Sequence, residues 1–252
     1  QPFTYRDRYV MVYNGEIYNF RELRKQLQDK GYEFASKTDT EVLIAMYDCY
    51  GKECVRHLNG MWAFAVYDKQ QQTVFCSRDR FGIKPFYYYY SGQAFIFASE
   101  IKQILLMRQG EAYANRQRLR DLDYTEETLF KDVKQLRGGY CLTLHVATGG
   151  CSVEQYYDLG RTRADRKNYR EACEEFRRLF ERSVALRLQA DVPVGYCLSG
   201  GLDSSAIVCM ADSIIAASGK EAQQHTISSC FEDKAYDEQE YIDEVVRHTQ
   251  VT

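Results

Sequence analysis

The chain has 252 residues, of which 45% are hydrophobic and 27% charged, and its formal net charge at pH 7 is -3. This composition is typical of a soluble globular protein with one large domain or two modest ones, and the lack of a basic run argues against a nucleic-acid partner. No apolar stretch reaches the roughly 18 residues of a membrane span, and the polar start does not resemble a signal peptide, so we expect a cytoplasmic protein without a membrane partner.

The nine cysteines are spread along the chain, are odd in number and form no Cys-x-x-Cys pair. In a long chain of this kind we expect reduced thiols that pack as small hydrophobic groups, among them Cys76, Cys197 and Cys209. The four histidines have no metal-ligand spacing, so the sequence gives little support for a zinc site.

The N-terminal part alternates short strands with helices. The first helix begins at Asn19, which has the spacing of a capping pair with Glu22, and the second is capped by Asp39 or Thr40. Taken alone, the polar clusters 14–16 and 38–41 are a turn after a strand and a helix cap. The expected segments are strands at 9–13 and 32–35 and helices over 19–31 and 39–50, each helix closed by glycine.

The middle of the chain is rich in strands with short connections, which predict an antiparallel sheet. The segment from Asp79 to Pro85 has a structural role in this prediction, because Gly82 and Pro85 shape a turn, and Lys84 receives no catalytic role. The expected strands are 61–67, 73–77, 86–90, 93–98, 140–146 and 152–157, with helical pieces at 100–107 and around 116–122.

The last third follows a different pattern. After a polar linker at about 160–167, an amphipathic helix is predicted over 168–188, with Phe176, Leu179, Phe180, Val184 and Leu188 on one side. Strand, loop, helix, strand and helix then alternate, the second strand at 224–231 and the last helix at 237–249. This alternation indicates one or two units of a parallel, doubly wound sheet, whose ligands bind at the carboxyl ends of the strands.

The stretch Ser199-Gly200-Gly201-Leu202-Asp203-Ser204-Ser205 lies between a predicted strand at 194–198 and a predicted helix at 206–218. Adjacent glycines permit positive φ and let a ligand approach the backbone, while the helix N-terminus offers free N–H groups and partial positive charge. The pattern therefore suits a phosphate or pyrophosphate. An ordinary strand-to-helix turn with a serine cap explains the bare Gly-Gly-x-Asp-Ser core equally well.

The full stretch resembles the pyrophosphate-binding loop of the ATP pyrophosphatases, and with 191–195 before it resembles the synthetase domain of glutamine-hydrolysing asparagine synthetases. The lysine of a Walker loop is absent. The first half resembles the class II (N-terminal nucleophile) glutamine amidotransferase domain of the same family. The motifs that carry this second resemblance, in the family's order, are Asn14–Asn19, Lys37–Glu41, Leu58–Ala65, Asp79–Tyr88 and Ser99–Lys102.

The resemblance covers nearly the whole chain and implies an α+β fold followed by an α/β fold. Residues 1–160 would form an N-terminal-nucleophile-hydrolase-like antiparallel sandwich with helices, the glutamine amidotransferase domain. Residues 168–252 would form the start of a doubly wound parallel-sheet nucleotide-binding domain, the ATP-pyrophosphatase-type synthetase domain.

The resemblance also implies roles for single residues. The side chain of Asn14 and the N–H of Gly15 would form an oxyanion hole for amide hydrolysis, and Glu16 and Asp39, with them, would bind glutamine through its ammonium group. Asp203 would be a Mg²⁺ ligand. The residues expected to bind ATP or its pyrophosphate are Cys197, Ser199, Gly200, Gly201, Asp203, Ser204, Ser205 and Ser229.

The sequence departs from the family at its start. These amidotransferases use an N-terminal cysteine as nucleophile, whereas residue 1 is Gln1 and the first cysteine, Cys49, lies within a predicted helix. The arginine that holds the glutamine carboxylate and most of the synthetase sheet are also unmatched. We therefore expect an internal fragment that shows no glutaminase or synthetase activity by itself.

For the intact protein, the resemblance implies a ligase that makes asparagine from aspartate, glutamine and ATP, with Mg²⁺, and releases AMP and pyrophosphate. The variants Cys197-Leu198-Ser199 and Cys230-Phe231-Glu232 leave open a carboxylate acceptor on a sugar or peptide. A non-catalytic nucleotide-binding module is a third hypothesis. A homodimer is compatible with the sequence, which does not specify quaternary structure.

Overall fold

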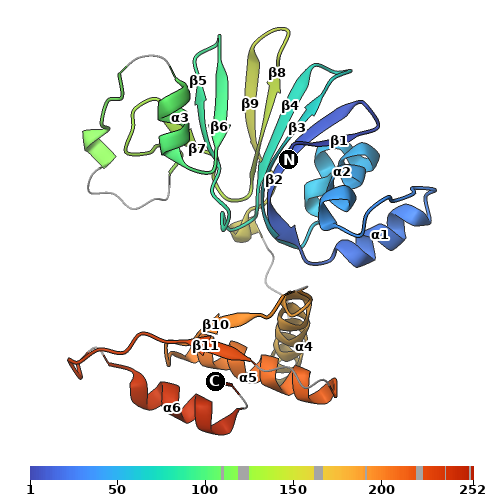
Figure 1. Cartoon of the computed structure of the whole chain (residues 1–252). Helices are drawn as coiled ribbons and strands as arrows, with labels where there is room; N and C mark the ends of the chain where they lie inside the picture. Colours follow the sequence, from blue (N-terminus) through green and yellow to red (C-terminus); the bar gives the residue numbers. More distant parts are fainter. Residues whose placement is uncertain are drawn as a thin grey trace. The chain divides into compact units, whose positions relative to one another are not determined.

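The computed structural model describes residues 1–108, 111–118, 125–161, 167–190, 192–219, 224–235, 237–249 and 251–252. It divides into two compact units, Gln1–Arg163 and Ala164–Thr252 (Figure 1). Within the described ranges, no helix combines the length and the apolar character that crossing a membrane requires. Parts of three predicted features lie outside these ranges: residues 119–122 of a helical piece, most of the linker, and Asp191.

Two antiparallel sheets form the framework of the first unit (Figure 1). The six-stranded sheet has the order β1-β2-β3-β4-β8-β9, and the three-stranded sheet has the order β6-β5-β7. The strands are β1 Phe3–Tyr5, β2 Tyr9–Ile17, β3 Gly60–Asp68, β4 Thr73–Arg78, β5 Tyr87–Tyr90, β6 Phe95–Ala98, β7 Val133–Gln135, β8 Tyr140–His145 and β9 Gly150–Gln155. Every pairing among them is antiparallel, which confirms the prediction from the short connections.

The alternation of side chains along β3 places the six-stranded sheet between two apolar layers. Trp62 and Phe64 face the helices α1 (Phe20–Gln28) and α2 (Asp39–Tyr50) and pack with them in one core. Ala63 and Ala65 face the three-stranded sheet and pack in a second core with its residues. Helix α3 (Ile101–Met107) contacts β5 and β6. The predicted sandwich of antiparallel sheets with helices is therefore confirmed.

The turn predicted at residues 14–16 is wrong. The segment Asn14-Gly15-Glu16 is not a turn, because β2 continues through it to Ile17 and pairs with β3 along its whole length. Cross-strand pairing overrides the local turn preference here. Gly15 lies directly opposite Trp62, at a position where no larger residue fits. Asn14, Gly15 and Glu16 therefore lie on a paired strand and not in a loop.

The helix caps also differ from the predictions. Asn19 precedes α1, but its side chain donates to the carbonyl of His57 and accepts from the N–H of Asn59 instead of capping the helix. The N-cap of α2 is Thr38, which accepts from the N–H of Glu41. Gly51 ends α2 with a φ of 57°, as predicted.

Residues 32–35 form no strand. The backbone N–H groups of Ala35 and Ser36 donate to the buried carboxylate of Glu41, so they are not available to a sheet. Burial opposes ionisation of Glu41, but these hydrogen bonds and that of the Ser36 hydroxyl keep the pKa of its carboxyl below the usual value. Four elements were not predicted from the sequence: β1, β7 and the 3₁₀ turns at Gly51–Arg56 and Leu159–Arg161. Of the helical piece predicted around 116–122, the described part forms a 3₁₀ turn at Arg116–Arg118.

A buried carboxylate organises the loop from Asp79 to Pro85. Asp79 is 1% exposed and accepts four backbone N–H bonds at 2.9 to 3.2 Å, whose donors are Trp62, Phe81, Ile83 and Lys84. The guanidinium of the neighbouring Arg78 donates to the carbonyls of Gly82, Lys84 and Leu136. These contacts confirm the structural role predicted for this segment.

The second unit begins with α4 (Tyr169–Arg187), whose first turn has a capping box formed by Asn168 and Glu171. Strands β10 (Gly195–Cys197) and β11 (His225–Ile227) pair in parallel, and a parallel bridge between Gln224 and Val251 starts a further pairing beside β11. Helices α5 (Leu202–Ala217) and α6 (Gln239–His248) contribute Val208, Ile242 and Val245 to its core. The predicted start of a parallel sheet is confirmed.

Three expectations for the second unit need correction. Helix α5 begins at Leu202 rather than at 206, so the end of the predicted loop is the first helical turn. Phe176 and Leu179, on the apolar side of the amphipathic helix predicted here, are exposed. Cys197 and Cys209 are exposed, because Cys197 lies on the face of β10 opposite Tyr196 and Cys209 lies beside the buried Val208 on α5; only Cys76 of the three named thiols is in a core.

Candidate active site

Among the residues that the structure describes, β2 pairs at Gly15 with β3 on one edge and with no strand on the other. Trp62 lies opposite Gly15 on β3, but its backbone groups bond with Asp79: its carbonyl accepts from the N–H of Asp79, and its own N–H donates to the Asp79 carboxylate. Opposed residues of an antiparallel pair either exchange both hydrogen bonds or neither, so Gly15 and Trp62 form a pair without hydrogen bonds. The N–H of Gly15 therefore points away from β3, toward the other edge of β2. Strand β1 covers that edge only as far as Met11, which pairs with Phe3.

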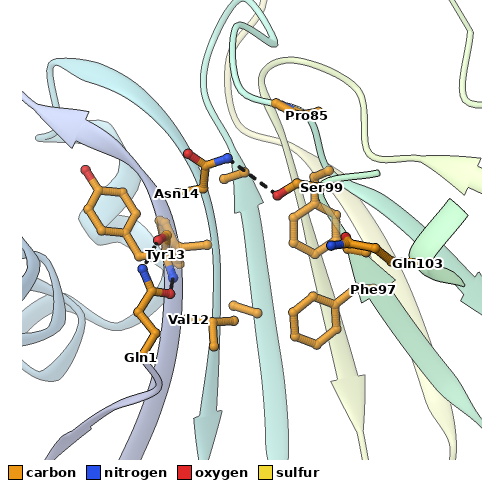
Figure 2. A pocket seen from close by; sticks show the side chains of 13 residues that line it. Gln1, Val12, Tyr13, Asn14, Pro85, Phe97, Ser99 and Gln103 are labelled. Atoms are coloured by element: carbon orange, nitrogen blue, oxygen red, sulfur yellow. Dashed lines mark hydrogen bonds between the residues drawn. The ribbon is translucent and has the colours of Figure 1, made fainter. Parts of the chain in front are cut away.

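Two side chains cover this edge on either side of Gly15. The carboxamide of Gln1 pairs with the backbone of Tyr13, accepting from its N–H at 2.9 Å and donating to its carbonyl (Figure 2). The carboxylate of Asp39 accepts from the N–H of Ile17 at 3.0 Å. Their backbone partners, Tyr13 and Ile17, each lie two positions from Gly15, about 7 Å along the strand. A β-carbon on Gly15 would lie 2.2 Å from the carbonyl of Met61, so this position requires glycine.

The side chain of Asn14 lies beside a cavity of about 500 Å³ in the first unit. Its Nδ2 donates to Oγ of Ser99 at 3.4 Å, and Figure 2 shows the two side chains approaching across the cavity. Gln1 and Tyr13 also line the cavity, and the hydrogen bond between them lies on the edge of β2 to which the Gly15 N–H points. The structure thus places the two predicted oxyanion donors, Asn14 and Gly15, on adjacent residues of one strand.

Two carboxylates gather at the same end of β2. Oδ2 of Asp39 accepts from the hydroxyl of Tyr13 at 2.7 Å as well as from Ile17, which fixes the carboxylate, while Oδ1 accepts only a long bond from Thr40 at 3.4 Å among the described residues. Burial, then the negative charges of Asp39 and Glu16, raise the pKa of Tyr13, so this phenol remains a donor. Neither carboxylate lines the cavity itself; they lie along the strand from it. Such a pair of charges suits an ammonium group.

Sequence reasoning missed three contributors to this site. Tyr13 holds Asp39, Gln1 covers the strand edge, and Ser99 contacts Asn14. Ser99 belongs to one of the motifs that carried the resemblance, but its partner is 85 residues away, and the sequence has no signal for that pairing. Gln1 and Tyr13 had no signal at all, because their partners lie 12 and 26 residues away along the chain.

The glycine-rich loop of the second unit folds onto itself before α5. Gly200 has a φ of 82°, the left-handed conformation that favours glycine, and a β-carbon there would press on Glu238 and Tyr241 at the start of α6. The hydroxyl of Ser204 bonds with the hydroxyl of Ser199 at 3.1 Å and donates to the carbonyl of Gly201 at 3.1 Å. Gly201 is the N-cap of α5 and provides no side-chain cap, so the first helical N–H groups face the loop.

The remaining residues predicted for this site lie around the same end of the sheet. Cys197 ends β10 and is exposed, and Ser229 is exposed two residues after β11 ends. Because the two strands are parallel, their carboxyl ends share one edge of the sheet. Asp203 is exposed in the first turn of α5, and an exposed carboxylate is compatible with the Mg²⁺ ligand predicted there, because Mg²⁺ prefers oxygen ligands.

Comparisons with known proteins agree with this division. Residues 1–157 match the family model described as glutamine amidotransferase domain, and residues 175–252 match the model described as asparagine synthase. The chain is 38% identical over 237 residues to asparagine synthetase [glutamine-hydrolyzing] 3 of Bacillus subtilis (strain 168), covering 91% of this chain and 38% of the relative. It is 37% identical over 250 residues to the putative asparagine synthetase [glutamine-hydrolyzing] 2 of Methanocaldococcus jannaschii, covering 94% and 46%.

Among solved structures, the glutamine phosphoribosylpyrophosphate amidotransferase of B. subtilis, complexed with ADP and GMP, has a TM-score of 0.46 and 16% identity over 93% of this chain and 49% of that chain. The chain spans less than half the length of both curated relatives. Its first unit carries the family match over 157 residues, and both units carry the similarity to the synthetases. The chain belongs to the glutamine amidotransferase domain family, within the group related to the glutamine-hydrolysing asparagine synthetases.

Proposed function

We propose that this protein belongs to an enzyme that transfers the amide nitrogen of glutamine to aspartate, using ATP and releasing AMP and pyrophosphate. The observation that carries the proposal is the arrangement around β2. The N–H of Gly15 points away from β3, and the carboxamide of the adjacent Asn14 lies beside the cavity. The carboxylate of Asp39, from α2, accepts from the N–H of Ile17 on the same strand. Asparagine synthetases are the named relatives of both units. We place the reaction in the cytoplasm, where its substrates are made.

In the first unit, the ammonium group of glutamine binds to Asp39 and Glu16. Asp39 is suited to this because Tyr13 and Ile17 hold one of its oxygens and leave the other for a ligand. The amide carbonyl then lies near Asn14 and Gly15, whose N–H groups stabilise the negative charge that develops during hydrolysis. None of the described residues that line the cavity is a cysteine, so the nucleophile of the family is assigned to no residue of this chain.

In the second unit, the loop 199–205 binds the β and γ phosphates of ATP, which leave as pyrophosphate when aspartate is adenylated. N–H groups at the start of α5 supply donors, and the hydroxyls of Ser199 and Ser204, which bond within the loop in this structure, turn with that of Ser205 toward the phosphate oxygens. Asp203 would hold Mg²⁺, which would supply positive charge to neutralise part of the phosphate charge. Ammonia from the first unit attacks the activated carboxylate and displaces AMP.

The Asp39→Asn variant tests the glutamine site directly. In the full-length gene product, we expect the KM for glutamine to rise about tenfold or more, because the amide places its own NH₂ where the substrate ammonium binds. We expect kcat to fall less, since Asp39 contacts the substrate and not the reacting carbonyl. Steady-state release of glutamate at increasing glutamine concentrations measures both constants.

The matched control is Asp48→Asn, at the other end of the same helix, where the carboxylate accepts from Arg6 and Tyr32. This control should leave the KM for glutamine within about twofold of the wild-type value. The reason is that α2 has 12 residues and Asp48 lies at its far end from Asp39. Equal KM values for wild type and Asp39→Asn would remove Asp39 from the binding site.

A further inference from the structure

A second cavity, of about 640 Å³, lies in the second unit. It is formed by the end of α4, the segment that leads into β10, the last turn of α5 and the first residues of β11. Its walls are mostly aliphatic, and its size falls in the range of small-molecule sites in proteins. The apolar lining includes Leu188, Val192, Pro193, Val194, Ile214 and Ile215.

Two buried polar atoms belong to residues that line this cavity. Oη of Tyr196 and Oε1 of Gln224 have no hydrogen-bond partner among the residues that the structure describes. Gln224 is 3% exposed, and its Nε2 donates to Asp212 at 3.2 Å, which fixes the amide so that Oε1 is left over as an acceptor. A buried polar atom without a partner costs about 1 to 3 kcal/mol, so a ligand that satisfies both atoms gains affinity.

This cavity is separate from the glycine-rich loop. The loop precedes the first turn of α5, whereas the cavity touches the last turn of the same helix. A helix of 16 residues is about 24 Å long, so the two sites lie at opposite ends of α5. The cavity lies at the amino ends of β10 and β11, while substrates of doubly wound sheets bind at the carboxyl ends.

We propose that this cavity binds an uncharged, mostly apolar small molecule that donates an N–H or O–H to Oε1 of Gln224 and shares a hydrogen bond with the hydroxyl of Tyr196. Among the described lining residues, none is Asp, Glu, Lys or Arg, and this described lining suits an uncharged ligand. The titratable residue His225 is at the rim, exposed, and bonds with Thr252. Burial raises the pKa of Tyr196, which keeps its phenol neutral.

Indole and 1-methylindole test the proposal on the chain of 252 residues. Both probes present nearly the same apolar body, but only indole has an N–H for Gln224. Calorimetric titration should give a Kd for indole about tenfold lower than for 1-methylindole, the effect of one buried hydrogen bond. Equal Kd values, or no binding of indole at millimolar concentration, would overturn the proposal.

Variants locate the binding to this cavity. Gln224→Met removes the acceptor and should raise the Kd for indole about tenfold without changing the Kd for 1-methylindole. The matched control is Gln239→Met, an exposed first residue of α6, which should leave both values unchanged. If far-ultraviolet circular dichroism shows that Gln224→Met folds poorly, Tyr196→Phe replaces it as the test variant, and it should raise the Kd for indole, whose N–H can also donate to the Tyr196 hydroxyl, without changing the Kd for 1-methylindole. An effect of Gln239→Met equal to that of Gln224→Met would contradict the assignment.

Discussion

Replacing Asn14 by alanine in the full-length gene product is expected to lower kcat for glutamine hydrolysis by about 10²- to 10³-fold, with little change in KM. The reason is that the Asn14 carboxamide donates to charge that exists only in the transition state, while substrate binding depends on the carboxylates of Glu16 and Asp39. Glutamate release at saturating and at low glutamine separates the two constants. The expected pattern is the reverse of that for Asp39→Asn.

The control for this prediction is Asn59→Ala. Asn59 is exposed in the turn before β3, and its contacts with Asn19 and Tyr18 use its backbone, so truncation of its side chain should leave kcat within about twofold. If Asn14→Ala raised KM and left kcat unchanged, Asn14 would be a residue of ground-state binding, and the oxyanion role would be wrong.

The second large effect is expected for Asp79→Asn, which should lower the free energy of unfolding of the first unit by about 3 kcal/mol. The carboxylate accepts four backbone N–H bonds, whereas an amide has a single acceptor oxygen and turns its NH₂ toward the remaining donors. Urea unfolding followed by tryptophan fluorescence measures this change. Trp62 is the only tryptophan of the chain, is fully buried, and donates its backbone N–H to Asp79, so its signal reports on this unit alone.

Asp29→Asn provides the comparison for Asp79. Asp29 is exposed at the end of α1, so its substitution should change the free energy of unfolding by less than about 0.5 kcal/mol. A cost below about 1 kcal/mol for Asp79→Asn would mean that the loop 79–85 is held chiefly by Arg78 and not by the carboxylate.

The layers of the fold could be predicted from the sequence because they depend on local periodicity. The apolar runs of β3 and β4, the short connection between them and the glycine at the end of α2 have the same meaning in isolation as in the folded unit. The continuation of β2 through Gly15 could not be predicted, since it depends on β3, which begins 45 positions later at Gly60. The absence of a strand at 32–35 has a local cause, since the Glu41 carboxylate, five to six residues along the chain, accepts from the N–H groups of Ala35 and Ser36, a contact for which the residue pattern gave no signal.

The candidate site was predicted only in part. Motif resemblance singled out Asn14, Gly15, Glu16 and Asp39, but residue patterns alone gave a turn and a cap. The structure brings Asp39 beside the strand that carries Asn14, Gly15 and Glu16, because its carboxylate accepts from Tyr13 and Ile17. The cavity beside Gln224 has no sequence signal, because its lining comes from four segments that meet only in the folded unit.

The most direct test of the proposed reaction measures all its products at once. The full-length gene product is incubated with glutamine, ATP, Mg²⁺ and aspartate, and glutamate, AMP, pyrophosphate and asparagine are quantified. The account predicts that AMP, pyrophosphate and asparagine form in equal amounts, that AMP requires aspartate, and that glutamate is released at least in proportion. Release of ADP and phosphate in place of AMP and pyrophosphate, or AMP formation that aspartate does not stimulate, would contradict it.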